Sequence, residues 1–430
     1  MEQFISPKKE AWKALLERPT ASYEDLEPLV EEVFEAVKTN GDDAVRKYTQ
    51  KFDGVTKETL RVSSAEIQTA IQRVSPELKA SICLAKDNIE RFHQAQRTAT
   101  VRVTTQNGVE CWQEKRPIQN VGLYIPGGSA PLFSTILMLA VPAQIAGCSE
   151  IVMCSPPDKN GALPDVVLYT ANLCGIEKIY TVGGIQAIAA MTFGTESIPN
   201  VYKLFGPGNQ YVTVAKQWAT RFNMAIDMPA GPSELLVVAD ATANPAYIAA
   251  DLLSQAEHGP DSQVILVTTA TEILPAVQCE ITTQLERLPR KAIAEKAIAN
   301  SKIIAFSTDD EAIDFINQYG PEHYIICMEN EDDYINAIQN AGSVFVGNYT
   351  PESAGDYASG TNHTLPTNGY AKQYSGVNLD SFLKQMTFQK LSAEGIKGIG
   401  PAIEAMAEAE GLQAHKNAVT LRLNDLKNES

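Results

Sequence analysis

The stretch NVGLYIPGGSAP, residues 120–131, joins a short apolar segment to a glycine-rich turn that leads into an apolar helix. The same order recurs twice: IYTVGG, residues 179–184, precedes IQAIAAMTFG, and VYKLFGPGN, residues 201–209, precedes QYVTVAKQWA. A second block begins near Glu234, where apolar segments such as ELLVVAD and QVILVTT alternate with helical stretches. Strands that alternate with helices form parallel sheets covered by helices. The sequence therefore predicts an α/β fold in two halves.

The rest of the chain has a helical pattern. Apolar residues recur at helical spacing through the first hundred residues, and Gly41 follows one such segment as a helix-ending residue. We expect a mostly helical region over 1–118, a first α/β half over 119–233 and a second over 234–380. Past residue 381 no further strand is predicted, and 381–430 should form a helical tail.

Composition narrows the classes of partner. The chain has 430 residues, with 52 acidic and 35 basic side chains and a formal net charge of −17. Such a surface repels phosphate backbones, which argues against nucleic acid. The most apolar run, 131–147, is interrupted by polar residues and is shorter than the ~20 apolar residues that span a membrane. Seven cysteines without a CxxC pair indicate reduced thiols, so we expect a cytoplasmic protein.

Four side chains are candidates for a metal site. Gln255 and His258 are three apart near the end of an expected helix, where they share one face. His258 could instead serve only as a favourable group at the negative helix end. Asp356, in the polar stretch 350–367, is a hard ligand for a divalent cation, whereas His415 in the tail could be an ordinary helix histidine. Two imidazoles, a carboxylate and an amide would suit Zn²⁺ with room for a substrate.

Acid and base groups are also present at loop edges. Glu322 and His323 follow Gly-Pro at the start of an expected strand, and together they offer two general bases of different strength. A surface pair before an edge strand is the alternative. Glu352 and His363 lie in the same polar stretch as Asp356, which is unusually long for a plain connection but could be a solvated loop.

The glycine-rich turns YIPGG, TVGG and FGPGN each place backbone N–H groups at a helix start, where they favour anions such as a pyrophosphate. The GxGxxG fingerprint with its later acidic residue is absent, so a cofactor site is only suggested. Cys111 and Cys148 are the obvious thiol candidates, but neither has a histidine nearby in sequence and both are interpreted as inert. His93 is interpreted as an ordinary helix residue.

Several stretches, taken together, resemble the histidinol dehydrogenase family. They are VGLYIPGGSAPLFST, FGPGNQYV, DMPAGPSE, DLLSQAEHGPDSQ, GPEHY, SAGDYASGTNH and GLQAHKNAV, in the family's order and over essentially the whole chain. The resemblance implies two incomplete Rossmann-like, aldehyde-dehydrogenase-like halves with an N-terminal helical segment and a C-terminal helical tail. It also implies that L-histidinol, two NAD⁺ and water give L-histidine and two NADH through histidinal, the final step of L-histidine biosynthesis.

The resemblance further assigns roles by motif match. The zinc ligands, one ion per subunit, look like Gln255, His258, Asp356 and His415, with His415 donated by the second subunit of a homodimer whose active sites are shared. Glu322 and His323 look like the catalytic pair. The remaining substrate contacts look like Ser233, His363 and Glu410, and the NAD contacts look like Tyr124, Gln186 and Asn209.

Three alternatives stay open from the residues alone. A zinc hydrolase would need no NAD, and the three glycine-rich turns argue against it. A two-lobed binding protein would need no acid/base pair beside a metal. A relative acting on another amino or sulfonated alcohol would share every motif, because substrate choice depends on the shape of the pocket.

Overall fold

The computed structural model describes residues 1–19, 25–127 and 131–428. Gly128 of the first glycine-rich turn lies outside this part of the chain. The chain divides into two compact units. The larger unit comprises Met1–Gln96 and Ile118–Phe382, and the smaller comprises Arg97–Pro117 and Leu383–Ser430.

The first sheet of the larger unit has five parallel strands in the order β6-β5-β4-β7-β8. The strands are β4(Asn120–Tyr124), β5(Glu150–Ser155), β6(Lys178–Thr181), β7(Lys203–Phe205) and β8(Ala225–Ile226). This order reverses between β4 and β7, and ligands of open α/β sheets bind beyond the carboxyl ends of strands at such a switch point.

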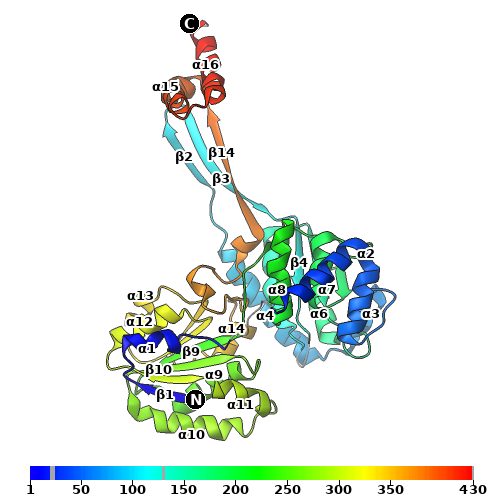
Figure 1. Cartoon of the computed structure of the whole chain (residues 1–430), viewed down its shortest axis with the longest axis vertical. Helices are drawn as coiled ribbons and strands as arrows, with labels where there is room; N and C mark the ends of the chain where they lie inside the picture. Colours follow the sequence, from blue (N-terminus) through cyan, green and yellow to red (C-terminus); the bar gives the residue numbers. More distant parts are fainter. Residues whose placement is uncertain (20–24, 128–130, 429–430) are drawn as a thin grey trace. The chain divides into compact units, whose positions relative to one another are not determined.

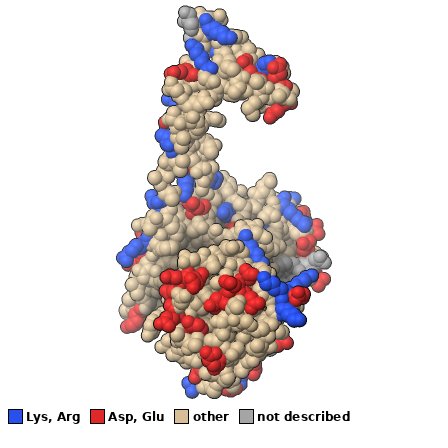
Figure 2. Space-filling view, turned by 90° about the vertical axis from the view of Figure 1, so that its left-hand side faces the viewer, with Lys and Arg blue, Asp and Glu red and all other residues tan. Residues whose placement is uncertain are grey.

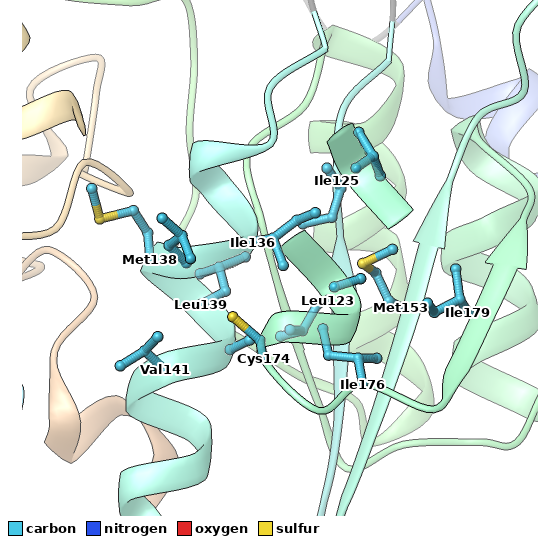
Figure 3. Packing of buried hydrophobic residues seen from close by; sticks show 14 of the residues in the cluster. Leu123, Ile125, Ile136, Met138, Leu139, Val141, Met153, Cys174, Ile176 and Ile179 are labelled. Atoms are coloured by element: carbon cyan, nitrogen blue, oxygen red, sulfur yellow. The ribbon is translucent and has the colours of Figure 1, made fainter. Parts of the chain in front are cut away.

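Helices cover both faces of this sheet (Figure 1). One face carries α3(Ser64–Arg73), α4(Pro76–Ala95), α5(Ser134–Ala146) and α6(Asp165–Leu173), and the other α2(Glu27–Asp53), α7(Gly184–Phe193) and α8(Gln210–Ala219). Figure 3 shows Leu123 and Ile125, from β4 and just after it, packed with Ile136 and Leu139 of α5. Because α5 is almost entirely apolar, it is buried on nearly every side.

The second sheet has six parallel strands in the order β1-β11-β10-β9-β12-β13. The strands are β1(Glu2–Ile5), β9(Glu234–Ala239), β10(Gln263–Thr268), β11(Lys302–Ala305), β12(His323–Cys327) and β13(Ser343–Val346). Helices α9(Pro245–Ala256), α10(Leu274–Leu285) and α11(Lys291–Ala299) cover one face, and α1(Lys9–Leu15), α12(Asp309–Tyr319) and α13(Glu331–Ala337) the other. The central strands β9, β10 and β12 are buried along their whole length, as expected for a parallel sheet covered on both faces.

The two predicted α/β halves and the helices before and after them are confirmed. The N-terminal segment also adds a strand to the second sheet, because β1 pairs with β11. Its helix α1 packs on one face of that sheet.

The smaller unit is an antiparallel sheet followed by two helices. Its strands β2(Val101–Gln106), β3(Val109–Pro117) and β14(Leu383–Leu391) run in the order β14-β3-β2 and lead to α15(Ala393–Ala409) and α16(Gln413–Asn428) (Figure 1). The expectation that strands stop at residue 381 was wrong, because β14 follows it. This strand is mostly exposed on both faces, so it carries no apolar alternation that would reveal it.

The surface reflects the excess of acidic residues. Figure 2 shows Asp and Glu side chains gathered closely on the face of the larger unit that is turned to the viewer. Acidic residues also begin α12 and α13, where they complement the positive helix end. Among the described residues, no helix is both long and apolar enough to cross a membrane.

Candidate active site

A cavity of about 650 Å³ in the larger unit collects most of the predicted site residues. Its lining includes Asn209, Ser233, Gln255, His258, Glu322, His323, Asp356 and His363. These residues come from five separate parts of the chain, and parallel strands bring them together because their loops lie at common sheet edges. The cavity therefore unites eight of the positions predicted from the sequence.

The metal candidates are positioned by two short stretches of helix. Asn244 caps α9 by accepting a hydrogen bond from the Ala246 N–H, and the helix ends at Ala256, so Gln255 is in its last turn. His258 lies just beyond, with its N–H donating to the Gln255 carbonyl at 3.2 Å. The stretch predicted as a loop over 350–367 begins instead as the helix α14(Glu352–Tyr357).

Helix α14 explains why a residue without an assigned role joins the site. Glu352 and Asp356 are four apart and share one face of α14. Ligand atoms of His258, Glu352 and Asp356 all lie within 4.8 Å of one another. Glu352 was noted in the sequence but was not assigned as a ligand. The four-residue spacing was the available signal, and it was missed because the stretch was interpreted as a loop.

The donor set fits a divalent cation. One imidazole nitrogen and two carboxylates match the ligand types of Zn²⁺. Glu352 is buried, and burial raises its pKa to about 8 despite the opposing effect of His323. Its carboxylate accepts hydrogen bonds from the Ser254 hydroxyl at 3.2 Å and from the Gln255 amide nitrogen. A nearby cation would offset the cost of keeping this buried carboxylate ionised.

Glu322 and His323 are both buried where β12 begins. The Glu322 Oε2 atom accepts a hydrogen bond from the Glu234 N–H at 2.8 Å. His323 Nδ1 lies 3.2 Å from the Glu234 carbonyl oxygen and 3.6 Å from Glu322 Oε2, and its Nε2 lies 3.5 Å from Asp356 Oδ1. Because a carbonyl can only accept, Nδ1 donates to Glu234, and Nε2 is the nitrogen directed toward Asp356.

Nearby carboxylates raise the pKa of His323 by more than its burial lowers it. Burial alone would lower its pKa, but the carboxylates of Glu322, Glu352 and Asp356 raise that pKa well above the ordinary value. The same imidazole helps to lower the pKa of Asp356 against the effect of its burial. With no cation on these carboxylates, His323 is therefore held protonated beside an ionised Asp356, and a cation that neutralised their charge would make its Nε2 available as a base.

His363 is held in one orientation. Its Nδ1 donates to the Asp356 carbonyl oxygen at 2.9 Å, which leaves Nε2 to accept from the Thr135 hydroxyl at 3.1 Å. Burial lowers its pKa, which favours the neutral ring. Ser233 lines the same cavity directly before β9.

The three cofactor candidates follow strands of the first sheet. Asn209 caps α8 by accepting from the Val212 N–H at 3.2 Å, and it lines the cavity. The Tyr124 hydroxyl accepts from the Gly184 N–H at 3.1 Å. Gln186 donates from Nε2 to Asp53 at 3.3 Å, while its buried Oε1 has no partner among the described residues. Tyr124 and Gln186 are both buried and are absent from the described lining of the cavity.

The two remaining candidates belong to the smaller unit. Glu410 is the residue that ends α15, and His415 lies in the first turn of α16. Both side chains are exposed. Both therefore belong to the smaller unit, whereas the eight cavity residues belong to the larger one.

No thiol, those of Cys111 and Cys148 included, lies among the described residues that line the cavity. Burial raises the pKa of Cys148 to about 12 and also raises that of Cys154, so both remain protonated at neutral pH. His93 is fully buried on α4, with Nδ1 2.8 Å from the Ile89 carbonyl, which agrees with its interpretation as a structural residue.

The fold is similar to that of an aldehyde dehydrogenase. The crystal structure of an acetylating aldehyde dehydrogenase from Geobacillus thermoglucosidasius matches with a TM-score of 0.50 at 13% identity, over 88% of this chain and 94% of that one, which is a likeness of fold alone.

A family model described as "Histidinol dehydrogenase" matches residues 16–423. The crystal structure of histidinol dehydrogenase from Elizabethkingia anophelis matches with a TM-score of 0.97 at 57% identity and 99% coverage of both chains. Histidinol dehydrogenase of Bacteroides thetaiotaomicron is 58% identical over 98% of both chains, and that of Escherichia coli (strain K12) is 52% identical over 98% of this chain and 97% of its own. The chain therefore belongs to the histidinol dehydrogenase family and is an oxidoreductase that acts on a small molecule.

Proposed function

We propose that this protein oxidises L-histidinol to L-histidine through histidinal, with two NAD⁺ as acceptors, in the final step of L-histidine biosynthesis. The observation that carries the proposal is a shared cavity lined by Glu322, His323, His258 and Asp356. Glu352 belongs to the same cation-type cluster as His258 and Asp356. A hydrolase would need the cluster but not the glycine-rich turns of the first sheet. Family membership favours the alcohol substrate.

The proposed zinc ligands are Gln255, His258 and Asp356, completed by His415 of a second copy of the chain. Glu352 would support this set through its hydrogen bond with Gln255 and its proximity to His258. A bound Zn²⁺ would orient the substrate and stabilise negative charge on its oxygen. Ser233, His363 and Glu410 would complete the substrate contacts, Glu410 also from the second copy.

His323 would take the proton of the alcohol in the first oxidation, because its Nε2 is directed toward Asp356 and its Nδ1 is held by Glu234. Glu322 would then deprotonate a water molecule that adds to histidinal, giving the hydrate for the second oxidation. NAD⁺ supplies the chemistry of accepting one hydride in each oxidation. The balance is one histidinol, one water and two NAD⁺ to one histidine, two NADH and the released protons.

The proposed cofactor contacts are Tyr124, Gln186 and Asn209. All three lie at or beyond the carboxyl ends of strands of the first sheet. The unpartnered Oε1 of Gln186 is a buried acceptor that a ligand hydroxyl or amide could satisfy. Because Tyr124 and Gln186 are buried, binding would need a local opening of the turns around Gly184.

A homodimer with shared sites would account for the smaller unit. Met406 on α15, Leu412 in the turn after it and Leu421 on α16 have 66%, 43% and 56% of their surfaces exposed, and exposed apolar side chains of this kind favour association. All seven cysteines are free, which agrees with a reducing compartment such as the cytoplasm.

The test is NADH formation from L-histidinol and NAD⁺ by the purified protein, before and after chelation and after zinc is added back. We expect two NADH per histidinol, loss of activity with the chelator and recovery with zinc. One NADH per substrate would exclude the four-electron reaction. Turnover of another amino alcohol with none of histidinol would redirect the assignment to that substrate.

A further inference from the structure

Arg18 and Glu234 form an ion pair that is almost fully removed from solvent. Arg18 Nε lies 2.9 Å from Glu234 Oε1 and Nη2 lies 3.1 Å from Oε2, with 10% and 2% of the two side chains exposed. Arg18 Nη2 also donates to the Tyr319 carbonyl at 2.8 Å, and the guanidinium lies 3.8 Å from the centre of the Tyr319 ring. The forked geometry fixes the carboxylate in both position and plane.

Stability alone is a poor reason for such a pair. The cost of removing two charges from water can exceed the attraction that they regain, so apolar residues of similar size are often as stable. The N-terminal segment is already attached to the second sheet by β1, which pairs with β11, and by Trp12 in the core. The pair therefore needs another explanation.

Glu234 contacts both residues of the proposed acid/base pair, Glu322 and His323, through two different backbone atoms. Its N–H donates to Glu322 Oε2 at 2.8 Å, and its carbonyl oxygen lies 3.2 Å from His323 Nδ1. Its carboxylate accepts from the Asn368 N–H at 2.6 Å, in the segment that follows His363. Glu234 is also the first residue of β9, where a strand would otherwise be free to fray.

We propose that Arg18 and Glu234 are positioning residues for Glu322 and His323, an inference that rests on the proposed function. The ion pair holds the side chain of Glu234, and its backbone N–H and carbonyl then hold the carboxylate of Glu322 and the tautomer of His323. Neither Arg18 nor the Glu234 carboxylate touches the substrate in this arrangement. A residue at the N-terminus thereby sets the geometry of proton transfer at β12.

The test compares Arg18→Met, Glu234→Gln and the double variant that carries both changes. Each single change leaves a buried charge without its partner, so each should lower the melting temperature. The double variant removes both charges and should recover melting temperature. Its kcat should nevertheless stay low by about 10–100-fold, because small displacements of catalytic groups cost that much. The solvent deuterium isotope effect on kcat should rise, since proton transfer becomes more rate-limiting.

Arg18→Lys keeps the charge but loses the fork, and it carries the test if a single variant fails to fold. We expect a smaller fall in kcat with a raised isotope effect. Lys9→Met is the matched control, because Lys9 also joins the N-terminal segment to the second half, through an exposed pair with Asp314 at 3.0 Å. It should keep the kcat and isotope effect of the unmodified protein.

The inference is overturned if the double variant recovers kcat together with melting temperature. It is equally overturned if kcat falls only with the folded fraction while the isotope effect is unchanged. Glu322→Gln separates this failure from that of the proposed function. Full turnover by Glu322→Gln removes the proposed catalytic role and this inference with it, whereas loss in that variant with a normal double variant overturns the positioning role alone.

Discussion

The Nε2 atom of His323 lies 3.5 Å from Oδ1 of Asp356, so the candidate general base is in ion-pair contact with a candidate metal ligand. A cation bound to Asp356 would weaken the electrostatic attraction between that carboxylate and a protonated His323. Substitution of either residue therefore changes the surroundings of the other. Metal content and proton transfer must be measured separately to distinguish their roles.

The metal site is tested by His258→Asn and Asp356→Asn. Each removes one member of the cluster in which ligand atoms lie within 4.8 Å. Both variants should lose metal affinity by at least ~10-fold, since even residues that only support ligands have effects of that size. Elemental analysis of zinc per subunit and titration with histidinol check the result. Glu257→Gln, next to His258 and outside the cluster, should retain its zinc, and normal zinc in both ligand variants would refute the assignment.

Glu322→Gln tests the division of labour between the two bases. The amide keeps an oxygen that can accept the hydrogen bond from the Glu234 N–H, so the fold should be preserved. Loss of a general base typically costs about 10²–10⁴-fold. We expect this loss in the oxidation of supplied histidinal and a smaller one in the first oxidation of histidinol. Single-turnover NADH formation from each compound measures the two steps, and equal losses would contradict the assigned roles.

The shared site predicts complementation between inactive variants. His258 belongs to the larger unit and His415 to the smaller, so a dimer of one His258→Asn chain and one His415→Asn chain would contain one intact site. Random mixing in two-fold dimers should then restore roughly a quarter of full activity. Co-expression with two affinity tags isolates the mixed dimer. If activity in the isolated mixed dimer remains at the level of the parents, each site is built within one chain.

Gly206→Ala tests the turn that carries the Asn209 cap. Gly206 has a φ of 126°, and an added Cβ would collide with the Tyr124 carbonyl oxygen. Strain and overlap together should cost about 3 kcal/mol or more. Gly54→Ala is the matched control, because Gly54 also has a positive φ of 71° but has no atom within 4 Å of the added Cβ. Its cost should be nearer to about 1 kcal/mol. Denaturant unfolding compares the two, and similar losses would refute the role of the collision.

Asp251 gives a pH dependence of stability. It is 8% exposed on α9, and burial raises its pKa from 3.8 to about 7. Its carboxyl therefore stays protonated in the folded protein between these values, while the unfolded chain has already lost the proton. Stability from this group is complete below pH 4 and is lost as the pH rises through about 7, by up to about 4 kcal/mol.

Asp251→Asn keeps a neutral side chain at every pH. Its stability relative to the unmodified protein should rise between pH 5 and pH 8, the interval in which the folded carboxyl is forced to ionise. Urea unfolding at the two pH values measures the difference, and the other titrating groups cancel in the comparison. A difference that is independent of pH would show that Asp251 is ionised in the folded protein throughout.

Prediction from the sequence was most accurate where the residues that determine a helix or strand lie within that same segment. Asn244 and Pro245 indicate a helix start by their residue types alone, and in the structure Asn244 caps α9 and Pro245 is its first residue. Prediction failed where the signal depends on other segments. Strand β14 is stabilised by pairing with β3 and buries little of its own surface, so no apolar pattern marks it. Helix α14 is a short turn of helix in a polar stretch, and its Glu352 gained a role only through its neighbours.

The sequence by itself determined the alternation of strands and helices, the glycine-rich turns and the types of chemical group available. Those features arise from side-chain periodicity and backbone preference within short segments. Only the tertiary structure decided that Arg18 meets Glu234 and that Glu234 meets His323, at sequence separations of 216 and 89 residues. Strand order decides the second of these contacts, because β9 lies beside β12 in the sheet and brings the start of one to the start of the other. Convergence of this kind depends on packing between distant segments and leaves no local pattern in the chain.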